Sequence, residues 1–455
     1  MSDFPKNLLQ SPSGFPELLP NEAIAQQKVI DVIRKHYERA GFVPIETPLV
    51  EREEVLTAKS EGEIGTQMYG LRLMNPAKDS PTDTKDLVLR YDHTVPMARF
   101  VAAHQREITF PFRRFAIGPV FRGERPREGR YRQFIQADID VIGDGILDNL
   151  HDAEIVSVIA NIFTELSIGD FTIRIGNRKL LQGILSSTGI NDSQIAEALL
   201  VIDHMEKVSA EDTIHALVRC GMTETTAKDV ITTLSDSRDS DEQLASLKER
   251  SLDELYKQGV GEIEALINGL RALGVSERHF TIDLSIARGL AYYTGNVFET
   301  RLDNHADIGS IASGGRYDDL ASTFIDKRLP GVGISIGVSR ILPRLIKTGL
   351  LSADISTTAP VIITTALPLE AHGAIYLRQA ALLRAAEIST EVYLTDRALG
   401  KELEYANKRG FIIALITGEQ ELAKGTIIVR DLRSGNQVEV HEQALVETVR
   451  SMMGA

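Results

Sequence analysis

The chain has 455 residues, and its hydrophobic (43%) and charged (25%) content is ordinary for a globular protein of two or three domains. A formal net charge of −14 disfavours nucleic-acid binding by the whole surface but leaves room for a local basic patch. No apolar run is long enough to span a membrane, and the first residues lack a basic and then apolar export signal. The single cysteine, Cys220, excludes an internal disulfide, and no Cys/His pair has metal-ligand spacing, so we expect a cytoplasmic protein without structural zinc.

The N-terminal part alternates between helical and extended patterns. Apolar spacing predicts a first helix over Asn21–Ala40, with its first residue as the cap. Prolines make residues 43–50 extended, and the polar residues 75–85 form a predicted loop. A strand over 87–91 then leads into a short helix predicted from Met97 to His104.

A predicted hairpin follows, and its loop contains five arginines between Phe121 and Phe134. In the strand after the loop, Gln136, Asp138 and Asp140 share one face. Guanidinium groups suit a polyphosphate, carboxylates suit an amine or an imidazole, and a site that binds both is what amino-acid activation by ATP requires. The alternative is a solvated hairpin tip beside the wet face of an antiparallel sheet. Arginine in place of lysine favours the site, because its fork binds phosphate bidentately.

The central part has a long helical region between strand signals. Residues 150–167 form a predicted helix and 171–176 a strand, and the pattern from 179 to 273 is almost wholly helical. We interpret this region as a helical insertion between two halves of a sheet domain. The later strand signals in this part cover residues 280–284, 293–301, 309–317 and 331–338.

Beyond a polar linker at 352–360, the sequence pattern predicts alternating strands and helices, as in a compact α/β domain. Strands are predicted over 361–365, 391–394, 411–417 and 426–431, and helices over 370–387, 400–409 and 442–452. The predicted organisation is therefore a catalytic core in two parts (1–178 and 276–350), a helical insertion (179–275), a linker (351–360) and a C-terminal α/β domain (361–455).

Four segments, in their order along the chain, closely resemble the histidyl-tRNA synthetases of class II: Leu89–Pro96, the arginine hairpin through Gly143, Ala287–Gly295, and Gly314–Asp318 with Gly331–Arg340. Phe121–Glu124 with the following loop and strand is similar to motif 2, Gly331–Arg340 to motif 3, and Glu46–Pro48 to motif 1. Arg288–Gly295 resembles the histidine-specific signature, with Ala291 in place of the usual aspartate. The region after Pro360 looks like the anticodon-binding domain of the family.

This resemblance implies an α+β fold with an antiparallel six-stranded catalytic core, and a homodimer. It also implies two reactions: L-histidine and ATP, with Mg²⁺ bridging the outer phosphates, give histidyl adenylate and pyrophosphate, and the histidyl group then moves to tRNA(His). Two rivals share parts of the pattern. One is the histidyl-like regulatory subunit of ATP phosphoribosyltransferase, which usually lacks the anticodon domain, and the other is an adenylate-forming ligase with a non-tRNA acceptor.

The resemblance assigns the ATP site and the catalytic residues. Arg122 would hold the α-phosphate and the histidine carboxylate, and Arg288 would lie on the opposite side of the same phosphate. Arg340, with Arg130, would bind the γ-phosphate, and Glu124 would approach the adenine end. Positioned cations lower the barrier because negative charge accumulates on the α-phosphate. Outside this context, Arg288 would be taken for a surface arginine.

The resemblance also gives the histidine pocket, which consists of Asp92, Thr94, Gln136, Asp140, Tyr292 and Tyr293. The first three would meet the α-ammonium, while Asp140 and Tyr293 would bracket the imidazole. A pocket that forms hydrogen bonds with both ring nitrogens rejects apolar isosteres, because a wrong side chain leaves buried polar groups unpaired. Alternatives stay open for two residues: Asp92 could cap the helix that follows, and Tyr292 could be sheet packing. Asp138 is interpreted as structural or as a support for the residues that contact the ligand.

Overall fold

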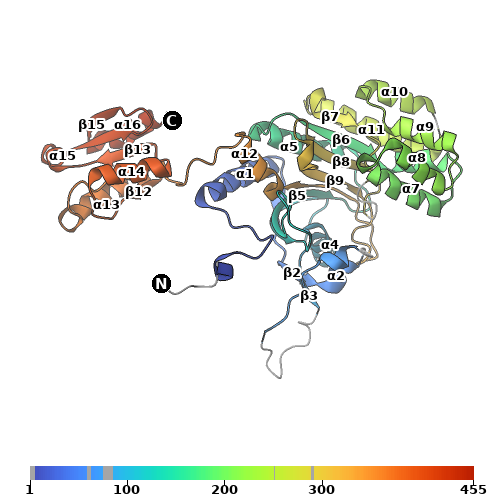
Figure 1. The fold of residues 1–455 in the computed structure, drawn as a ribbon, viewed down its shortest axis with the longest axis horizontal. Helices are drawn as coiled ribbons and strands as arrows, with labels where there is room; N and C mark the ends of the chain where they lie inside the picture. The colour runs from blue at the N-terminus through green and yellow to red at the C-terminus, as the bar shows by residue number, and fades with distance from the viewer. Residues whose placement is uncertain (1–5, 59–62, 75–85, 251, 288–291, 455) are drawn as a thin grey trace. The chain divides into compact units, whose positions relative to one another are not determined.

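The computed structural model describes residues 6–58, 63–74, 86–250, 252–287 and 292–454 (Figure 1). The chain forms two compact units. One contains residues 28–350 and the described residues before Leu18, and the other contains residues 18–27 and the chain from Leu351 onward. Within the described ranges, no helix combines the length and apolarity needed to cross a membrane.

A large mixed sheet forms the centre of the first unit (Figure 1). Among the described residues it has eight strands in the order β1 (Val43–Pro44), β4 (Phe112–Phe121), β5 (Gln133–Ile142), β10 (Gly331–Gly337), β9 (Ala312–Tyr317), β8 (Asn296–Leu302), β6 (Phe171–Asn177) and β7 (Phe280–Ile282). The six strands from β4 to β6 are antiparallel, which confirms the expected core, while β1 and β7 run parallel to their neighbours at the two edges.

The register of this sheet places charged residues beside very small ones. Arg114 pairs with Asp140, Asp140 also pairs with Gly333, and Gly333 pairs with Gly315, so one row crosses four strands. The neighbouring row on the same face contains Asp138, Ser335 and Ser313. Because β10 and β9 carry only glycine and serine in these rows, the face is hollow next to the carboxylates of β5.

The opposite face of β5 is apolar and packs against helices. Ala137, Ile139 and Val141 are fully buried, and the buried Tyr37 hydroxyl donates a hydrogen bond to the Ala137 carbonyl at 3.0 Å. The covering helices include α1 (Pro20–Arg39), α5 (Leu150–Leu166) and α12 (Val338–Lys347). Alternation of polar and apolar residues along β5 therefore separates a pocket face from a core face, as the sequence predicts.

Two predicted helix starts are wrong. Helix α1 begins at Pro20, because proline suits the first turn, and the Asn21 side chain donates to the Ala353 carbonyl at 2.8 Å in place of capping. Helix α4 (Thr94–Ala103) begins three residues earlier than expected. The N-cap position is His93, and Asp92 Oδ1 accepts from the backbone N–H groups of Thr94 (3.0 Å) and Val95 (3.1 Å), so one oxygen of Asp92 bonds the first turn of the helix.

The predicted helical region between β6 and β7 contains six α-helices among its described residues: α6 (Arg178–Ser186), α7 (Asp192–His204), α8 (Ala210–Arg219), α9 (Glu224–Leu234), α10 (Ser240–Arg250) and α11 (Glu254–Ala272). Side chains of Asn177, Asn191, Ser209, Thr223 and Asp253 cap five of them. These caps divide one long helical pattern into separate helices, because each cap satisfies N–H groups that a continuous helix would bond internally.

Short elements surround the sheet of the first unit. The small sheet pairs β2 (Val50–Arg52) with β3 (Leu87–Leu89), and the other elements are α2 (Glu53–Thr57), α3 (Glu63–Gln67), η1 (Lys6–Leu9), η3 (Met205–Lys207), η4 (Glu277–His279) and η5 (Ala306–Ile308). Strand β8 starts three residues later than the prediction of 293–301, since Tyr293 is not part of the ladder.

The second unit has its own sheet and apolar core. Its strands, in order, are β12 (Thr390–Val392), β11 (Val361–Ile363), β13 (Ile413–Ile416), β14 (Thr426–Asp431) and β15 (Gln437–His441). Its helices are α13 (Leu369–Ala385), α14 (Leu399–Arg409), α15 (Glu419–Lys424), η6 (Glu442–Ala444) and α16 (Leu445–Met453). The first three strands are parallel and the last two antiparallel, so this is the α/β architecture that the sequence predicts. Short α15 and the exposed edge strand β15 were not predicted.

Candidate active site

Two adjoining hollows lie over the polar face of the central strands. The first, which we name the arginine pocket, has a volume of about 140 Å³ and is lined by Arg122, Glu124, Arg130 and Arg340 among others. The second, the acidic pocket, has about 230 Å³ and contains all six residues predicted to bind histidine. Arg122, Gln136, Ser313 and Ser335 line both hollows. The two predicted sites are therefore continuous.

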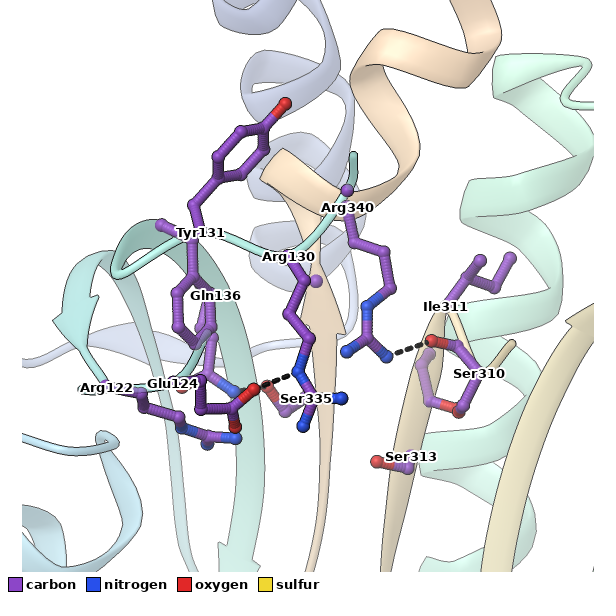
Figure 2. A pocket seen from close by; sticks show the side chains of 14 residues that line it. Arg122, Glu124, Arg130, Tyr131, Gln136, Ser310, Ile311, Ser313, Ser335 and Arg340 are labelled. Atoms are coloured by element: carbon purple, nitrogen blue, oxygen red, sulfur yellow. Dashed lines mark hydrogen bonds and ion pairs between the residues drawn. The ribbon is translucent and has the colours of Figure 1, made fainter. Parts of the chain in front are cut away.

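Three guanidinium groups extend into the arginine pocket from different segments (Figure 2). Arg122 follows the end of β4, Arg130 lies in the loop after it, and Arg340 is in the first turn of α12. Arg340 Nη1 donates to the Ser310 carbonyl at 2.7 Å, and Arg130 pairs with Glu124. Tyr131 points away from this group in the same view. Three guanidinium groups that line one hollow make an anion site.

Arg122 is held at the boundary of the two pockets by aromatic rings. Its guanidinium carbon lies 4.3 Å from the centroid of Tyr91 and 5.3 Å from that of Phe134. Arg122 Nε also donates to the Tyr91 carbonyl at 3.2 Å. Stacking fixes the plane of the guanidinium while its outer N–H groups point toward the pocket, which suits bidentate binding of a phosphate or a carboxylate.

The acidic pocket combines side chains from α4, β5, β9 and the segment before β8. Asp92 and Thr94 come from the start of α4, Gln136, Asp138 and Asp140 from β5, Tyr317 from β9, and Tyr292 and Tyr293 from the segment before β8. Within the described part of the chain, Gln136 Oε1 and Asp138 Oδ1 are buried without a hydrogen-bond partner. Buried acceptors of this kind are costly unless a ligand donates to them. The pocket is therefore suited to a ligand with N–H groups.

A fully buried arginine, which the sequence interpretation missed, lies beneath this pocket. Arg114 Nη2 is 2.5 Å from Asp140 Oδ2, and the Tyr317 hydroxyl donates to Asp140 Oδ1 at 2.9 Å. Burial raises the pKa of Asp140 to about 6, and Arg114 opposes that rise. Burial also raises the pKa of Asp138 to about 6. Two carboxylates and one guanidinium thus share a dry site, and Arg114 is what keeps the acids able to ionise.

The phenols of the pocket remain protonated. Burial and the nearby Asp140 carboxylate raise the pKa of Tyr317 well above its ordinary value, and desolvation followed by Asp140 raises the pKa of Tyr293 in the same direction. Both phenols are therefore hydrogen-bond donors at neutral pH. A side chain at Gly333 would collide with the Asp140 carboxylate, so glycine is required at this position in β10.

A signal for Arg114 existed in the sequence. Arg114 and its neighbour Arg113 directly precede the apolar residues 115–121, and the hairpin that the sequence predicts pairs this strand with the one carrying Asp140. Only the register decides that these two residues are directly opposite. Arg288, the remaining predicted catalytic residue, lies with residues 289–291 outside the described residues. The structure thus brings together ten of the eleven predicted site residues around two hollows.

Comparisons with known proteins cover the whole of this architecture. A histidyl-tRNA synthetase family model matches residues 14–341, and an anticodon binding domain model matches residues 361–452. A histidine–tRNA ligase from Stenotrophomonas maltophilia is 42% identical over 454 residues, and one from Clostridium tetani is 38% identical over 439 residues. The first alignment covers 97% of both chains, and the second covers 96% of this chain and 97% of the relative.

Solved structures agree with these matches. The crystal structure of histidyl-tRNA synthetase from Nostoc sp. PCC 7120 has a TM-score of 0.89 and 40% identity, covering 97% of this chain and 99% of that one. A Bacillus halodurans protein described as an ATP phosphoribosyltransferase regulatory subunit/histidyl-tRNA synthetase shares the fold, with a TM-score of 0.72 at 20% identity over 88% of this chain and 96% of that one. The chain therefore belongs to the histidyl-tRNA synthetase family of class II, with an anticodon-binding domain after its catalytic sheet.

Proposed function

We propose that this chain activates L-histidine with ATP and transfers the histidyl group to tRNA(His), as the names of its relatives state for them. The observation that carries the proposal is the position of Arg122, which lines the arginine pocket and the acidic pocket at once. A cation there can bind the carboxylate of an amino acid and the α-phosphate of ATP together. The paired pockets supply the rest of each substrate site.

In the first reaction, a carboxylate oxygen of histidine attacks the α-phosphorus of ATP. The bond from that phosphorus to the bridging oxygen of the β-phosphate breaks, and pyrophosphate leaves with the electron pair. Arg122 neutralises charge on the α-phosphate and aligns the attacking carboxylate, while Arg340 and Arg130 hold the γ-phosphate and Glu124 meets the adenine end. The resemblance assigns Arg288 to the other side of the α-phosphate, although it lies outside the described residues.

Magnesium enters with the nucleotide, as MgATP. The arginine pocket offers one carboxylate, Glu124, and this already pairs with Arg130. In the described part of the chain, no group of three or more His, Cys, Asp or Glu residues could hold a metal. These residues therefore fit an Mg²⁺ ion that would be held mainly by the outer phosphates of ATP. Mg²⁺ usually keeps several of its waters and needs few protein ligands.

Histidine recognition follows from the polarity of the acidic pocket. The α-ammonium donates to Asp92 and Gln136, with Thr94 beside them, and Gln136 Oε1 gains the donor that it lacks. Asp140 accepts from one imidazole N–H, and the Tyr293 hydroxyl donates to the other ring nitrogen. Tyr292 lines the pocket. A ligand that lacks either ring nitrogen would leave buried polar groups unpaired. The pocket should therefore favour histidine over such a ligand by several orders of magnitude.

In the second reaction, a hydroxyl oxygen of the terminal ribose of tRNA attacks the histidyl carbonyl carbon, and the bond from that carbon to the phosphate oxygen breaks. AMP leaves with the electron pair, and its phosphate takes up the hydroxyl proton. We assign the acceptor end to the loop that carries Arg125 and Arg127, and the anticodon to the second unit, which matches the anticodon-binding domain model. The family resemblance further supports a homodimer in the cytoplasm. Sedimentation of the purified protein measures the mass of the particle and so tests the dimer.

Two assays separate this proposal from its rivals. A synthetase catalyses both histidine-dependent exchange of pyrophosphate into ATP and charging of tRNA(His). A regulatory subunit would fail both assays, and a ligase with another acceptor would pass only the exchange assay. The regulator-like neighbour shares only the fold at 20% identity, while Arg122 and Arg340 both line the arginine pocket here. Absence of exchange with wild-type protein would overturn the proposed function.

A further inference from the structure

A second basic hollow, which we name the outer basic pocket, adjoins the arginine pocket. It has a volume of about 620 Å³ and shares Gly129, Arg130, Ser310 and Arg340 with its neighbour. Figure 2 shows the two shared arginines, Arg130 and Arg340, in the lining of the arginine pocket. The outer pocket adds three further cations, Arg127, Lys207 and Arg344, none of which has a role in the first reaction above. It is thus an extension of the γ-phosphate end of the nucleotide site.

The outer basic pocket is positively charged, although the chain as a whole is acidic. Five cations line it among the described residues, against two acids, Glu128 and Asp307, whereas the whole chain has a formal charge of −14. Each acid already has a cation near it, because Glu128 lies 3.5 Å from Lys347 Nζ and Asp307 lies 3.7 Å from Arg344 Nη1. A local excess of positive charge in an acidic protein attracts a small, highly charged anion.

Lys207 reaches this pocket from the helical insertion, and its backbone is anchored. Its neighbour Glu206 accepts from Arg174 Nη2 of β6 and from Arg301 Nη2 of β8, each at 2.5 Å. Arg174 also lies 2.5 Å from Asp283. These ion pairs connect η3 to two strands of the central sheet, so the turn presents Lys207 at a fixed place although Lys207 itself is exposed.

Arg344 is oriented on the α12 side of the pocket. Its Nη2 lies 2.9 Å from His305 Nδ1, in the segment just before η5. Within the described residues, Arg344 Nε is buried without a hydrogen-bond partner. The guanidinium is thus held at Nη1 by Asp307 and at Nη2 by His305, and its Nε is a buried donor that an oxyanion can satisfy.

We propose that the outer basic pocket binds pyrophosphate after it leaves the α-phosphate and before its release. This inference rests on the proposed function. In the proposed reaction, one end of the pyrophosphate is held by Arg130 and Arg340, which line both hollows. Pyrophosphate that moves from the arginine pocket to the outer basic pocket therefore stays in contact with cations throughout. No covalent bond changes in this step. In the reverse reaction the same pocket is where pyrophosphate enters.

The test uses Lys207→Ala in the full-length protein, with the KM for pyrophosphate in histidine-dependent exchange as the readout. We expect this KM to rise by about threefold to tenfold, since a single charged contact is lost. The KM for histidine stays unchanged, and Lys207→Arg restores the wild-type value. Lys228→Ala is the matched control, because it removes the same charge from helix α9 of the insertion, where the side chain is 57% exposed and pairs with Glu224.

Each outcome decides the proposal. An unchanged KM for pyrophosphate in Lys207→Ala, in a wild-type background that exchanges normally, overturns it. A higher KM for tRNA(His) with no change for pyrophosphate assigns the pocket to the tRNA and also overturns it. If wild-type protein shows no exchange, the proposed function fails, and calorimetric titration with pyrophosphate alone still tests the pocket. Weaker pyrophosphate binding by Lys207→Ala than by Lys228→Ala supports the site, and equal binding contradicts it.

Discussion

The arginine pocket and the acidic pocket adjoin each other, yet they hold their charges in opposite ways. The Arg130 side chain is 42% exposed, and Arg122 and Arg340 have partners that are rings or carbonyls. The Arg114 side chain is 0% exposed and pairs with Asp140, whose side chain is 6% exposed. The first pocket leaves its cations partly exposed to a charged, hydrated ligand, while the second buries its charges in ion pairs before any ligand arrives.

The difference separates the expected effects of substitution. A partly exposed cation contributes little to folding, so its loss should appear in turnover. A buried ion pair leaves an uncompensated charge when one member is removed, so its loss should appear in stability as well as in binding. Four measurements sharpen or break this comparison.

The largest effect is expected for Arg114→Met. The substitution leaves Asp138 and Asp140 buried without their cation, and we expect a loss of about 3–5 kcal/mol in the free energy of unfolding. Urea unfolding measures it. Arg328→Ala is the control, because Arg328 is 64% exposed and pairs with Asp318 at the surface, where a change under about 1 kcal/mol is expected. Equal losses in the two variants would show that Arg114 has no special role.

Arg122→Ala should lower exchange turnover by about 10²–10³, the effect of removing one preorganised donor to a developing charge. Its free energy of unfolding should change far less than that of Arg114→Met. Arg122→Lys keeps the charge but loses the fork, so it should recover only part of the rate. Turnover like that of the wild type in Arg122→Ala would remove this residue from the mechanism.

The third measurement is the pH dependence of stability. Burial raises the pKa of Asp138 and of Asp140 from 3.8 to about 6, so the folded state binds more protons than the unfolded state between these values. The free energy of unfolding should therefore fall as pH rises from 4 to 6, by at most about 1.4 kcal/mol per pH unit for each group. Asp140→Asn should flatten the curve in this window.

Glu154 provides a control with the opposite sign. Hydrogen bonds from His151 and Arg113 lower the pKa of Glu154 to about 2. The stability that Glu154 contributes is present above its unfolded pKa of 4.5 and is lost as pH falls toward 2. Glu154→Gln should thus lower the free energy of unfolding above pH 4.5, with the difference from wild type shrinking as pH falls toward 2, and it should leave the slope between pH 5 and 6 unchanged. The same slope in Asp140→Asn and in wild type would contradict the assignment.

The smallest effect is expected for Tyr317→Phe, which removes the 2.9 Å hydrogen bond to Asp140. We expect a loss of about 1 kcal/mol, seen as a KM for histidine about fivefold higher with turnover unchanged. Tyr37→Phe is the matched control, since Tyr37 is also fully buried but donates to the Ala137 carbonyl on the core face of β5. A similar rise in KM in both variants would mean that Tyr317 acts only through folding.

The acidic face of β5 and the arginine-rich loop could be predicted because their rules are local, whereas the other site residues came from the family resemblance. Alternation along β5 placed Gln136 and Asp140 on the same face, and loop chemistry placed Arg122 and Arg130 near each other. Errors arose where a local rule had a tertiary competitor. Asn21 was expected to cap α1, but its amide donates to Ala353, which is 332 residues away.

The sequence alone determined the alternation of β5, the glycines of β10 and the arginine-rich loop, since each depends on residues that are neighbours in the chain. Only the tertiary structure decided which charges meet. Arg114 faces Asp140 because β4 and β5 pair in one register, and Tyr317 reaches the same carboxylate across 177 residues of chain. The physical reason is that the energy of a buried charge depends on its partner and its desolvation, and both are set by distant strands that come together only on folding.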